Sequence, residues 1–390
     1  MIKINTQAEK CLNILKSHGY EAFLVGGCVR DALLGRVCDD IDITTNASPE
    51  QVINIFEHTI PTGIKHGTIT VIIDKKPIEV TTYRTEGSYT DSRHPDSVTF
   101  VSDLSQDLSR RDFTINALAY NQINGLVDYH GGIEDLNNKI IRTVGDPKIR
   151  FEEDALRILR AVRFSCALGF EIEKYTKKAI NLFFPLLTKV SGERVFQELY
   201  KLSCAKKFDS FLNFINSGGL APFGIYSSTS FHCFSELSNL CRSADTKLVL
   251  LLSLTEHSTD TIIKELKVSK KVAEQLRFLD TVKNSKIIED KIELKRLLRS
   301  YNLEKVTLFI TYISLFSSVS GKLMQNLLEE ILSNNEPFRV SDLKISGTDL
   351  IDLGYAGADI GILLDKALEY IILDPSKNNK HDIISFIQNI

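Results

Sequence analysis

The feature that most constrains the fold of this 390-residue chain is a change of hydrophobic period near Glu152. Up to about residue 130, short strand-like segments alternate with helical ones. From Glu152 onward the strand signals nearly vanish and helical spacing takes over. The change predicts an α+β head followed by a long, mostly helical body. The strand-like segments read FLVGG, DDIDITT, GTITVIID and PIEVTTYR.

Length and composition are those of a globular protein with several domains. A chain of 390 residues is too long for one compact core, and its length favours roughly two to four domains. Its contents of 43% hydrophobic and 25% charged residues are close to the averages of soluble proteins. No apolar run approaches the ~20 residues of a membrane helix, and the start resembles an amphipathic helix rather than a signal peptide. We therefore expect a cytoplasmic protein that does not enter a membrane.

Charge and cysteine content exclude few functions. The net charge of −3 argues against a uniformly basic surface for nonspecific nucleic-acid binding, although a local basic strip remains possible. The seven cysteines are scattered and never form a CxxC pair, which disfavours a zinc site or a disulfide framework. Composition alone therefore predicts no function.

The first motif is a glycine turn, in which Gly26 and Gly27 follow a short apolar strand and precede a helix start. Adjacent glycines let backbone amides approach a phosphate, and a helix N-terminus adds positive potential. Arg30 can add a guanidinium to the same anion. The alternative is an ordinary Gly-Gly turn, which is common.

Acidic residues follow shortly afterwards, at Asp40 and Asp42. If both lie in a strand, residues i and i+2 point to the same face and two carboxylates stand side by side. Such hard oxygen ligands suit Mg²⁺ bound together with substrate phosphates. Glu79, on a neighbouring apolar strand, is a candidate third carboxylate. The alternative is a solvated edge strand with acidic outer positions.

A second basic motif, RRDFTINALA, begins at Arg110. It places Arg111 and Asp112 at the entrance to what we expect to be an apolar helix. Arg111 suits a triphosphate, and Asp112 can orient it or accept a ribose hydroxyl. Alternatively, Asp112 caps the helix and the arginines are solvated. The segment between Thr85 and Arg110 is polar and turn-rich, and a connection of that length tends to be functional or mobile.

A third motif, EDALRILRAVR, begins at Glu153. Asp154 and Arg157 are three residues apart, so we expect them on one helix face, with Arg160 continuing the stripe and Arg163 drifting away from it. In a fixed Asp–Arg pair, the carboxylate can accept a hydrogen bond from the amino group of cytosine or adenine, and the guanidinium can donate one to the ring nitrogen. Uracil and guanine would leave both side chains unpaired. The alternative is an ion-paired surface helix.

Together these motifs resemble the class II tRNA nucleotidyltransferases, the bacterial CCA-adding enzymes of the polymerase-β superfamily. The resemblance covers about residues 20 to 200, and more loosely the C-terminal segment, where Ala356 stands in place of an expected proline. It implies a polymerase-β-like head with a mixed sheet, followed by an all-helical neck, body and tail. We place these at residues 1–130, 131–205, 206–310 and 311–390. The motifs that carry it are LVGGCVRDALLG, DDIDITT, RRDFTINALAY, GGIEDLNNKIIRTVGDP, RFEEDALRILRAVRF and SGERVFQEL.

The resemblance also implies roles for single residues. It makes Asp40 and Asp42 the metal ligands, with Glu79 a weaker third catalytic carboxylate. The remaining residues would bind the nucleotide, through the phosphate turn, the second motif and the base-reading motif. They are Gly26, Gly27 and Arg30; Arg111, Asp112 and Asn116; and Asp154, Arg157, Arg160 and Arg163.

The activity that the resemblance implies best is addition of C, C and A to the 3′ end of tRNA, from CTP and ATP with release of pyrophosphate. The cofactor would be Mg²⁺ and the RNA partner the tRNA acceptor arm and 3′ end; no protein partner is implied. CC-only addition is disfavoured by a long loop after the first motif. That loop carries the expected Glu86, Tyr89, Asp91, Arg93 and Pro95.

Four alternatives to CCA addition are to be weighed. Addition of the terminal A alone fits the same motifs. Poly(A) polymerase is disfavoured by Ala155 and by the absence of a strongly basic C-terminal tail. A non-catalytic RNA-binding protein, or a nucleotide sensor or phosphohydrolase, is a different class. The intact pair of repelling aspartates argues against the non-catalytic reading.

Overall fold

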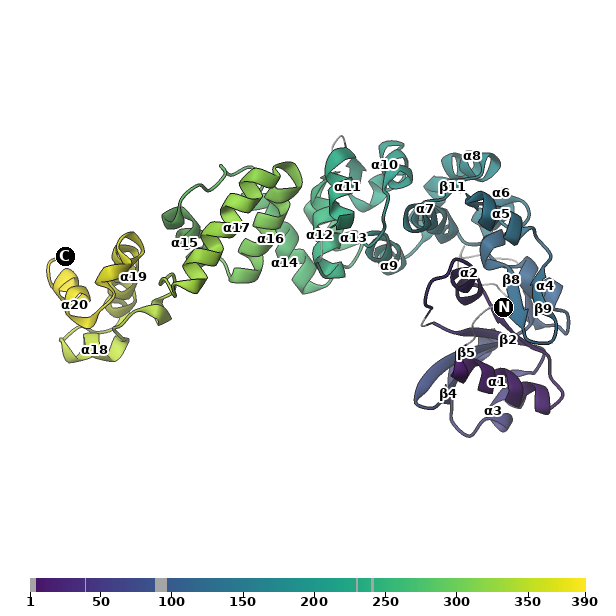
Figure 1. Ribbon diagram of the computed structural model, residues 1–390. Coiled ribbons are helices and arrows are strands. Elements are labelled where there is room, and N and C mark those ends of the chain that lie inside the picture. The colour runs from purple at the N-terminus through teal and green to yellow at the C-terminus, as the bar shows by residue number, and fades with distance from the viewer. Residues whose placement is uncertain (1–4, 39, 88–96, 229–230, 240–241) are drawn as a thin grey trace. The chain divides into compact units, whose positions relative to one another are not determined.

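The computed structural model describes residues 5–38, 40–87, 97–228, 231–239 and 242–390 (Figure 1). The chain forms two compact units. The first comprises Met1–Thr229 and Glu256–Val268, and the second Ser230–Thr255 and Ser269–Ile390. The finer division at residues 130, 205 and 310 stays a prediction.

A seven-stranded mixed sheet organises the start of the first unit. Its strand order is β3-β4-β5-β2-β1-β8-β9, in which β2 and β5 run parallel and the other neighbours antiparallel. The strands are β1 (Ala22–Val25), β2 (Asp42–Thr45), β3 (Thr59–Gly63), β4 (Thr68–Ile73), β5 (Lys76–Thr82), β8 (Leu118–Asn121) and β9 (Gly125–Asp128). The helices of this region are α1 (Thr6–Ser17), α2 (Gly27–Leu33), α3 (Pro49–Ile55) and α4 (Leu104–Ser109).

Helices cover both faces of this sheet. The amphipathic helix α1 buries Ala8, Cys11, Leu12 and Leu15, spaced three and four apart, in a core shared with the sheet and α3 (Figure 1). Ser48 caps the N-terminus of α3, where its side chain accepts from the amide of Gln51. On the other face, α4 packs in a second core with β1 and β8. The central strands are therefore apolar on both faces.

Two expectations for the region after the first motifs are corrected. The run that follows Asp112 is not an apolar helix: a 3₁₀ turn over Thr114–Asn116 leads into β8, an interior strand of the sheet. All four β8 residues are buried, and a short apolar run buried on both faces cannot be told from a helix by its period. The segment from Thr85 to Arg110 also contains regular structure, namely β6 (Arg84–Glu86), its antiparallel partner β7 (Val98–Phe100) and α4.

The rest of the first unit is mainly helical. Helix α7 (Leu156–Leu168) is its central element and packs against α6, α9 and α10. Gly192 starts α9, and a Cβ there would lie 1.7 Å from the carbonyl oxygen of Glu265, so only glycine allows α9 to approach α13 so closely. The helices are α5 (Gly132–Asn138), α6 (Pro147–Glu153), α8 (Lys174–Phe183), α9 (Gly192–Leu202), α10 (Asp209–Asn216) and α13 (Thr259–Glu265). Two short strand pairs join β10 (Ile140–Ile141) to β11 (Glu171–Ile172) and β12 (Ile225–Ser227) to β13 (Glu256–His257).

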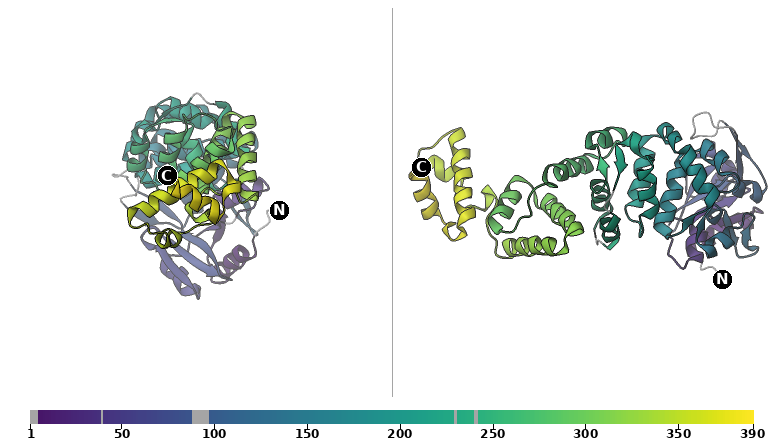
Figure 2. Two further views of the ribbon diagram at one scale, coloured as in Figure 1. Left: turned by 90° about the vertical axis from the view of Figure 1, so that its left-hand side faces the viewer. Right: turned by 90° about the horizontal axis from the view of Figure 1, so that it is seen from above.

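The second unit is built from helices (Figure 2). Its C-terminal part has its own core, in which α19 and α20 bury Ile371, Ile372 and Ile383. The buried Lys295 donates to the carbonyl oxygen of Ile372 at 3.0 Å and so ties α15 to the end of α19. The helices are α11 (Phe231–Asn239), α12 (Ala244–Ser253), α14 (Lys270–Val282), α15 (Lys291–Ser300), α16 (Leu303–Phe316), α17 (Ser318–Ser333), α18 (Gly347–Asp352), α19 (Ala358–Leu373) and α20 (Lys380–Gln388).

The predicted fold class, a mixed-sheet head followed by helical domains, is confirmed. Within the described ranges, no helix is both long and apolar enough to span a membrane.

Candidate active site

The predicted glycine turn lies between β1 and α2. Gly26 has a φ of +73°, a conformation that residues with a Cβ adopt at a cost. A Cβ on Gly26 would lie 3.2 Å from Nη1 of Arg111 and 3.8 Å from Oδ2 of Asp42. The turn therefore brings the first and second sequence motifs together, because the missing side chain leaves room for both groups.

Two of the predicted carboxylates lie on neighbouring parallel strands, one at the start of β2 and one in the middle of β5. Asp42 is the first residue of β2 and is paired in register with Glu79 of β5. Asp40 lies two residues before β2, so the prediction that it shares a strand with Asp42 is wrong. Burial raises the pKa of Asp42 to about 6, against the opposing effect of the Arg111 charge, and the nearby charges of Glu79 and Asp40 raise it further.

This carboxylate set fits a divalent cation. The oxygens of Asp40, Asp42 and Glu79 are hard ligands, and their mutual repulsion, seen in the raised pKa of Asp42, is relieved by a cation between them. Among the described residues, no three His, Cys, Asp or Glu side chains form a cluster that could hold a metal alone. A metal here would therefore also need oxygen ligands from a bound nucleotide.

Arg111 lies beside this carboxylate set with spare hydrogen-bonding capacity. Its Nη2 donates to Asp107 of α4 at 3.3 Å. Its Nε is buried and has no hydrogen-bond partner within the described part of the chain. An unpaired buried guanidinium N–H is costly, so the site favours an anionic ligand that accepts from it.

Arg30, Asn116, Asp112 and Arg160 form one chain of hydrogen bonds. Arg30 donates from Nη1 to Oδ1 of Asn116 at 2.6 Å, and Asn116 donates from Nδ2 to Oδ1 of Asp112 at 3.0 Å. Arg160 of α7 donates to Oδ2 of Asp112 from Nε at 2.9 Å and from Nη2 at 2.6 Å. Asp112 is therefore held by the protein itself rather than capping a helix, and it links the sheet to α7.

The charges of this chain stabilise one another. Burial would raise the pKa of Asp112, but the Arg160 ion pair, the Asn116 amide and the Arg157 charge outweigh it and lower the pKa to about 2. The same Asp112 charge helps to raise the pKa of Arg160 against the opposing effect of burial. Both groups are thus fixed in their charged forms.

The base-reading motif differs from its expected geometry. Helix α6 ends at Glu153, Asp154 is extended with φ −141° and ψ 101°, and α7 begins only at Leu156. The prediction that Asp154 and Arg157 share one helix face is therefore wrong. Asp154 accepts instead from Arg194 of α9, at 3.2 and 2.8 Å.

Arg157 is held by other groups. It donates to Glu153 at 2.5 Å and to the backbone carbonyl of Arg110 at 3.1 Å. The alternative of an ion-paired surface helix is therefore met in part: Arg157 is ion-paired with Glu153, but its side chain is only 10% exposed. The structure brings Asp154 and Arg157 to the same end of α7 but supports each from a different element.

Sequence reasoning missed the residues that surround Arg163. Its guanidinium is paired with Glu198 of α9 at 2.5 Å and lies 3.9 Å from the ring centroid of Phe164. The guanidinium groups of Arg30 and Arg160 also lie over this ring, at 5.0 and 5.4 Å. Arg194 and Glu198 are four residues apart in GERVFQEL, and this i, i+4 charge spacing was the available signal.

The long loop after the first motif is described only in part. Glu86 accepts from Arg84 at 2.8 Å and from Arg110 at 3.1 Å, which ties β6 to the end of α4. The other four predicted loop residues, Tyr89, Asp91, Arg93 and Pro95, lie outside the described residues.

Comparison with family models agrees with this geometry. Residues 22–142 match the family described as poly A polymerase head domain. Residues 169–221 match the family described as probable RNA and SrmB-binding site of polymerase A. The sheet, its paired carboxylates and the neighbouring arginine thus define a nucleotidyltransferase head.

Full-length relatives narrow this class. The chain is 36% identical to the CCA-adding enzyme of Lactobacillus helveticus over 98% of its own length and 97% of the relative's. It is 34% identical to the CCA-adding enzyme of Staphylococcus aureus, with the same shares covered. The crystal structure of the Bacillus stearothermophilus CCA-adding enzyme in complex with CTP has a TM-score of 0.81 and 32% identity, covering 98% of this chain and 96% of that one. The chain belongs to the CCA-adding enzyme family.

Proposed function

We propose that this tRNA nucleotidyltransferase adds C, C and A in turn to the 3′ end of tRNA, using CTP and ATP. In each step the terminal 3′-hydroxyl of the RNA attacks the α-phosphorus of the nucleotide, a new phosphodiester bond forms, and pyrophosphate leaves. The observation that carries the proposal is the convergence of Asp42, Glu79 and Arg111 at the Gly26 turn, in a chain that matches CCA-adding enzymes over its full length.

Asp40 and Asp42 would hold the metal, which we propose to be Mg²⁺, with Glu79 beside them. Bound there, Mg²⁺ would supply positive charge at the reacting phosphate and hydroxyl oxygens. Mg²⁺ suits the site because it is commonly held by one or two carboxylates together with substrate phosphates.

The Gly26–Gly27 turn and Arg111 would bind the triphosphate. The turn lacks side chains where phosphate oxygens approach, and α2 begins there with free amide groups. Arg111 offers its unpaired Nε and neutralises charge on the leaving pyrophosphate. These groups act on any nucleoside triphosphate, so they do not select the base.

Asp154 and Arg157 would select the base. The Asp154 carboxylate accepts from the amino group of cytosine or adenine, and the Arg157 guanidinium donates to the neighbouring ring nitrogen. Uracil and guanine would place a carbonyl oxygen against the carboxylate and a ring N–H against the guanidinium, and such a mismatch can reject them by roughly 10⁴-fold. Arg194 holds the Asp154 side chain in place, and Glu153 holds that of Arg157.

The chain from Arg30 through Asn116 and Asp112 to Arg160 would position α7 against the sheet. Both carboxylate oxygens of Asp112 accept from protein donors, as do those of Asp154, but Asp112 is buried whereas Asp154 is partly exposed. We therefore assign Asp112, Asn116 and Arg160 to positioning rather than to direct contact with the nucleotide. We also assign Arg163 to positioning, because its guanidinium is paired with Glu198.

The test of this assignment is RNA extension by an Asp42→Ala variant. Wild-type protein with Mg²⁺ should extend a tRNA that lacks its last three nucleotides, and the variant should not, while its melting temperature stays close to that of the wild type. The matched control is Asp74→Asn, which removes an exposed carboxylate from the same unit. Extension by Asp42→Ala at the wild-type rate would refute the assigned metal site. The cytoplasmic location stays a prediction.

A further inference from the structure

The buried carboxylate of Asp107 lies one helical turn before the two arginines of the second motif. Asp107 is in α4, and Arg110 and Arg111 follow it by three and four residues, so all three side chains lie near one face of the helix end. Burial alone would raise the pKa of Asp107, but the charges of Arg110 and Arg111 outweigh it and lower the pKa. Asp107 is therefore a fixed negative charge beneath this pair of arginines.

Both oxygens of the Asp107 carboxylate are bound by protein donors. Oδ1 accepts from Nε of Arg110 at 3.0 Å and lies 2.8 Å from its Nη2. Oδ2 accepts from Nη2 of Arg111 at 3.3 Å and from the hydroxyl of Thr44 at 3.1 Å. Thr44 is buried in β2, two residues after Asp42. The carboxylate thus ties both arginines to the strand that carries Asp42.

Arg111 has a competing partner in Asp42. Nη1 of Arg111 and Oδ2 of Asp42 both approach Gly26, at 3.2 and 3.8 Å from a Cβ built on it. Burial raises the pKa of Asp42 and the charge of Arg111 opposes this rise, so the two groups attract each other. A guanidinium released from Asp107 would move toward this carboxylate and away from the glycine turn. Asp107 therefore holds Nη2, which leaves Nη1 and Nε of Arg111 for the triphosphate.

Arg110 connects the same carboxylate to the base-reading motif. Arg110 is the C-cap of α4, and its backbone carbonyl is one of those that a helix end leaves without an intrahelical partner. Nη2 of Arg157 donates to this carbonyl at 3.1 Å. The Arg110 side chain is held by Asp107 and also donates to Glu86 at 3.1 Å. Because these ion pairs fix Arg110, the position of Arg157 depends on Asp107.

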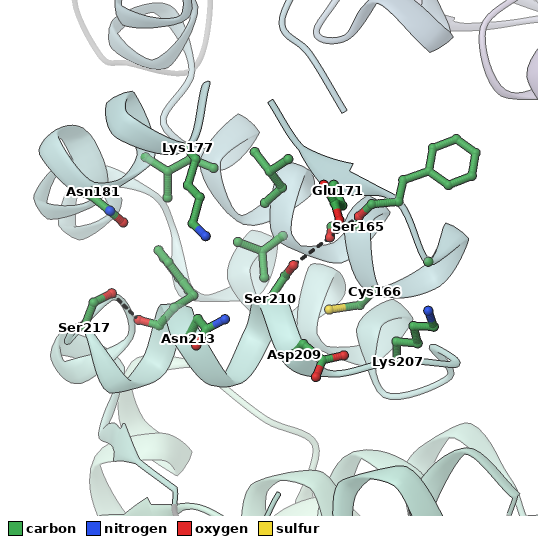
Figure 3. A pocket seen from close by; sticks show the side chains of 16 residues that line it. Ser165, Cys166, Glu171, Lys177, Asn181, Lys207, Asp209, Ser210, Asn213 and Ser217 are labelled. Atoms are coloured by element: carbon green, nitrogen blue, oxygen red, sulfur yellow. Dashed lines mark hydrogen bonds between the residues drawn. The ribbon is translucent and has the colours of Figure 1, made fainter. Parts of the chain in front are cut away.

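Helix α7, which carries Arg157, has a groove along another of its faces. This groove of about 740 Å³ lies between α7, α8 and α10, and Ser165 and Cys166 of α7 help to line it (Figure 3). Ser165 and Ser210 of α10 are joined there by a hydrogen bond of 2.6 Å (Figure 3). Protein interiors are usually filled to high density, so α7 is packed less tightly on this face. The contacts at its N-terminal end therefore matter more for the position of Arg157.

We propose that Asp107 is a positioning residue that couples the triphosphate end of the nucleotide site to its base-reading end. It acts on the triphosphate through Arg111, and on the base through Arg110 and Arg157. Asp107 itself is fully buried and does not touch the nucleotide. The inference rests on the proposed function, since it requires that Arg111 and Arg157 contact the nucleotide.

Equilibrium dialysis of labelled CTP against the full chain, with Mg²⁺ and without RNA, tests the proposal. Displacement of CTP by pyrophosphate measures binding at the triphosphate end, and displacement by UTP measures base discrimination. The variant is Asp107→Asn. The matched control is Asp103→Asn, which removes a charge from the exposed N-cap of the same helix and leaves a side chain that can still cap it.

We expect Asp107→Asn to weaken pyrophosphate binding about tenfold and to lower the preference for CTP over UTP about tenfold, whereas Asp103→Asn should change neither. In an Arg111→Met background, Asp107→Asn should weaken pyrophosphate binding no further, because Asp107 acts on the triphosphate through Arg111. A merely structural role would give additive losses instead. Additive losses, a loss at one end of the site alone, or wild-type binding by Asp107→Asn overturns the proposal.

A second variant keeps the test decisive if Asp107→Asn fails to fold. Arg110→Gln leaves Asp107 bound to Arg111 and Thr44. It should therefore lower the preference for CTP over UTP and leave pyrophosphate binding unchanged. An unchanged preference, or weaker pyrophosphate binding, overturns the proposal. Failure of the proposed function would be seen separately, as a wild-type protein that neither binds CTP nor extends tRNA.

Discussion

The ion pair between Asp112 and Arg160 makes a quantitative prediction about stability. Asp112→Asn keeps the shape of the side chain but removes the charge that Arg160 faces at 2.6 Å. The pair joins the sheet region to α7, since Asp112 precedes the turn before β8 and Arg160 lies in α7. Removing the charge therefore leaves the Arg160 guanidinium without its strongest partner at this junction.

The magnitude follows from the pKa of Asp112. Its pKa is lowered from 3.8 to about 2, and each pKa unit corresponds to about 1.4 kcal/mol, so its charge contributes about 2–3 kcal/mol. Removing one partner of a fully buried pair costs roughly 3–5 kcal/mol. Arg160 is 31% exposed, so the smaller figure applies. For a unit of this size the loss corresponds to about 5–10 °C in melting temperature.

Thermal unfolding of wild type and variant measures this difference. The control Asp74→Asn removes an exposed partner of Lys10 and should leave the melting temperature essentially unchanged. Because the pKa of Asp112 is lower in the folded than in the unfolded state, its contribution is present above about pH 4 and lost as the pH falls toward 2. The gap in melting temperature between wild type and Asp112→Asn should therefore narrow from pH 6 to pH 3.

Activity supplies the second readout of the same variant. Since Asp112 positions α7, its loss should lower kcat/KM for CTP and ATP together, by about tenfold. A melting temperature equal to that of the wild type at pH 6, or a gap that widens toward pH 3, would refute the reasoning about the pair. A selective loss for one nucleotide would refute the positioning role.

Three further predictions concern other contacts. Arg194→Met removes the two hydrogen bonds that hold the Asp154 carboxylate. In single-nucleotide extension, misincorporation of UTP and GTP relative to CTP should then rise about tenfold. Unchanged selectivity would refute the role of Arg194 in positioning Asp154. Gly26→Ala places a Cβ 3.2 Å from Arg111 on a residue with positive φ. It should lower the free energy of unfolding by about 1–2 kcal/mol in chemical denaturation and raise the KM for both CTP and ATP. KM values equal to those of the wild type would contradict a triphosphate site at this turn. Lys295→Met removes a buried lysine of the second unit. Thermal unfolding should show the second unit melting at a lower temperature and the first unit melting as in the wild type. A loss of stability in the first unit would contradict separate cores for the two units.

Much of the site was predictable because its determinants are local. The turn at Gly26 follows from adjacent glycines after an apolar strand. Glu79 was identified as a candidate from its apolar strand alone, and its register opposite Asp42 could not be predicted. Strand pairing between distant segments is decided by tertiary packing that a single sequence does not show.

Two of the structural errors have clear physical reasons. Strand β8 is short, apolar and buried on both faces, so it lacks the alternation that distinguishes a strand from a helix. The break at Asp154 interrupts a stretch with continuous helical spacing. Arg194, forty residues away, supports this break by binding the Asp154 carboxylate at 2.8 Å. Such supporting residues lie outside the motif they hold, and local spacing therefore did not connect them to it.

The most direct test of the account is nucleotide addition to a tRNA that lacks its last three nucleotides. Purified protein with Mg²⁺ is given CTP alone, ATP alone, or both, and the products are resolved to single-nucleotide length. The account predicts extension by two residues with CTP and by three with both nucleotides. No extension of this RNA, together with addition of a single A to a tRNA already ending in CC, would contradict full CCA addition and leave an A-adding enzyme.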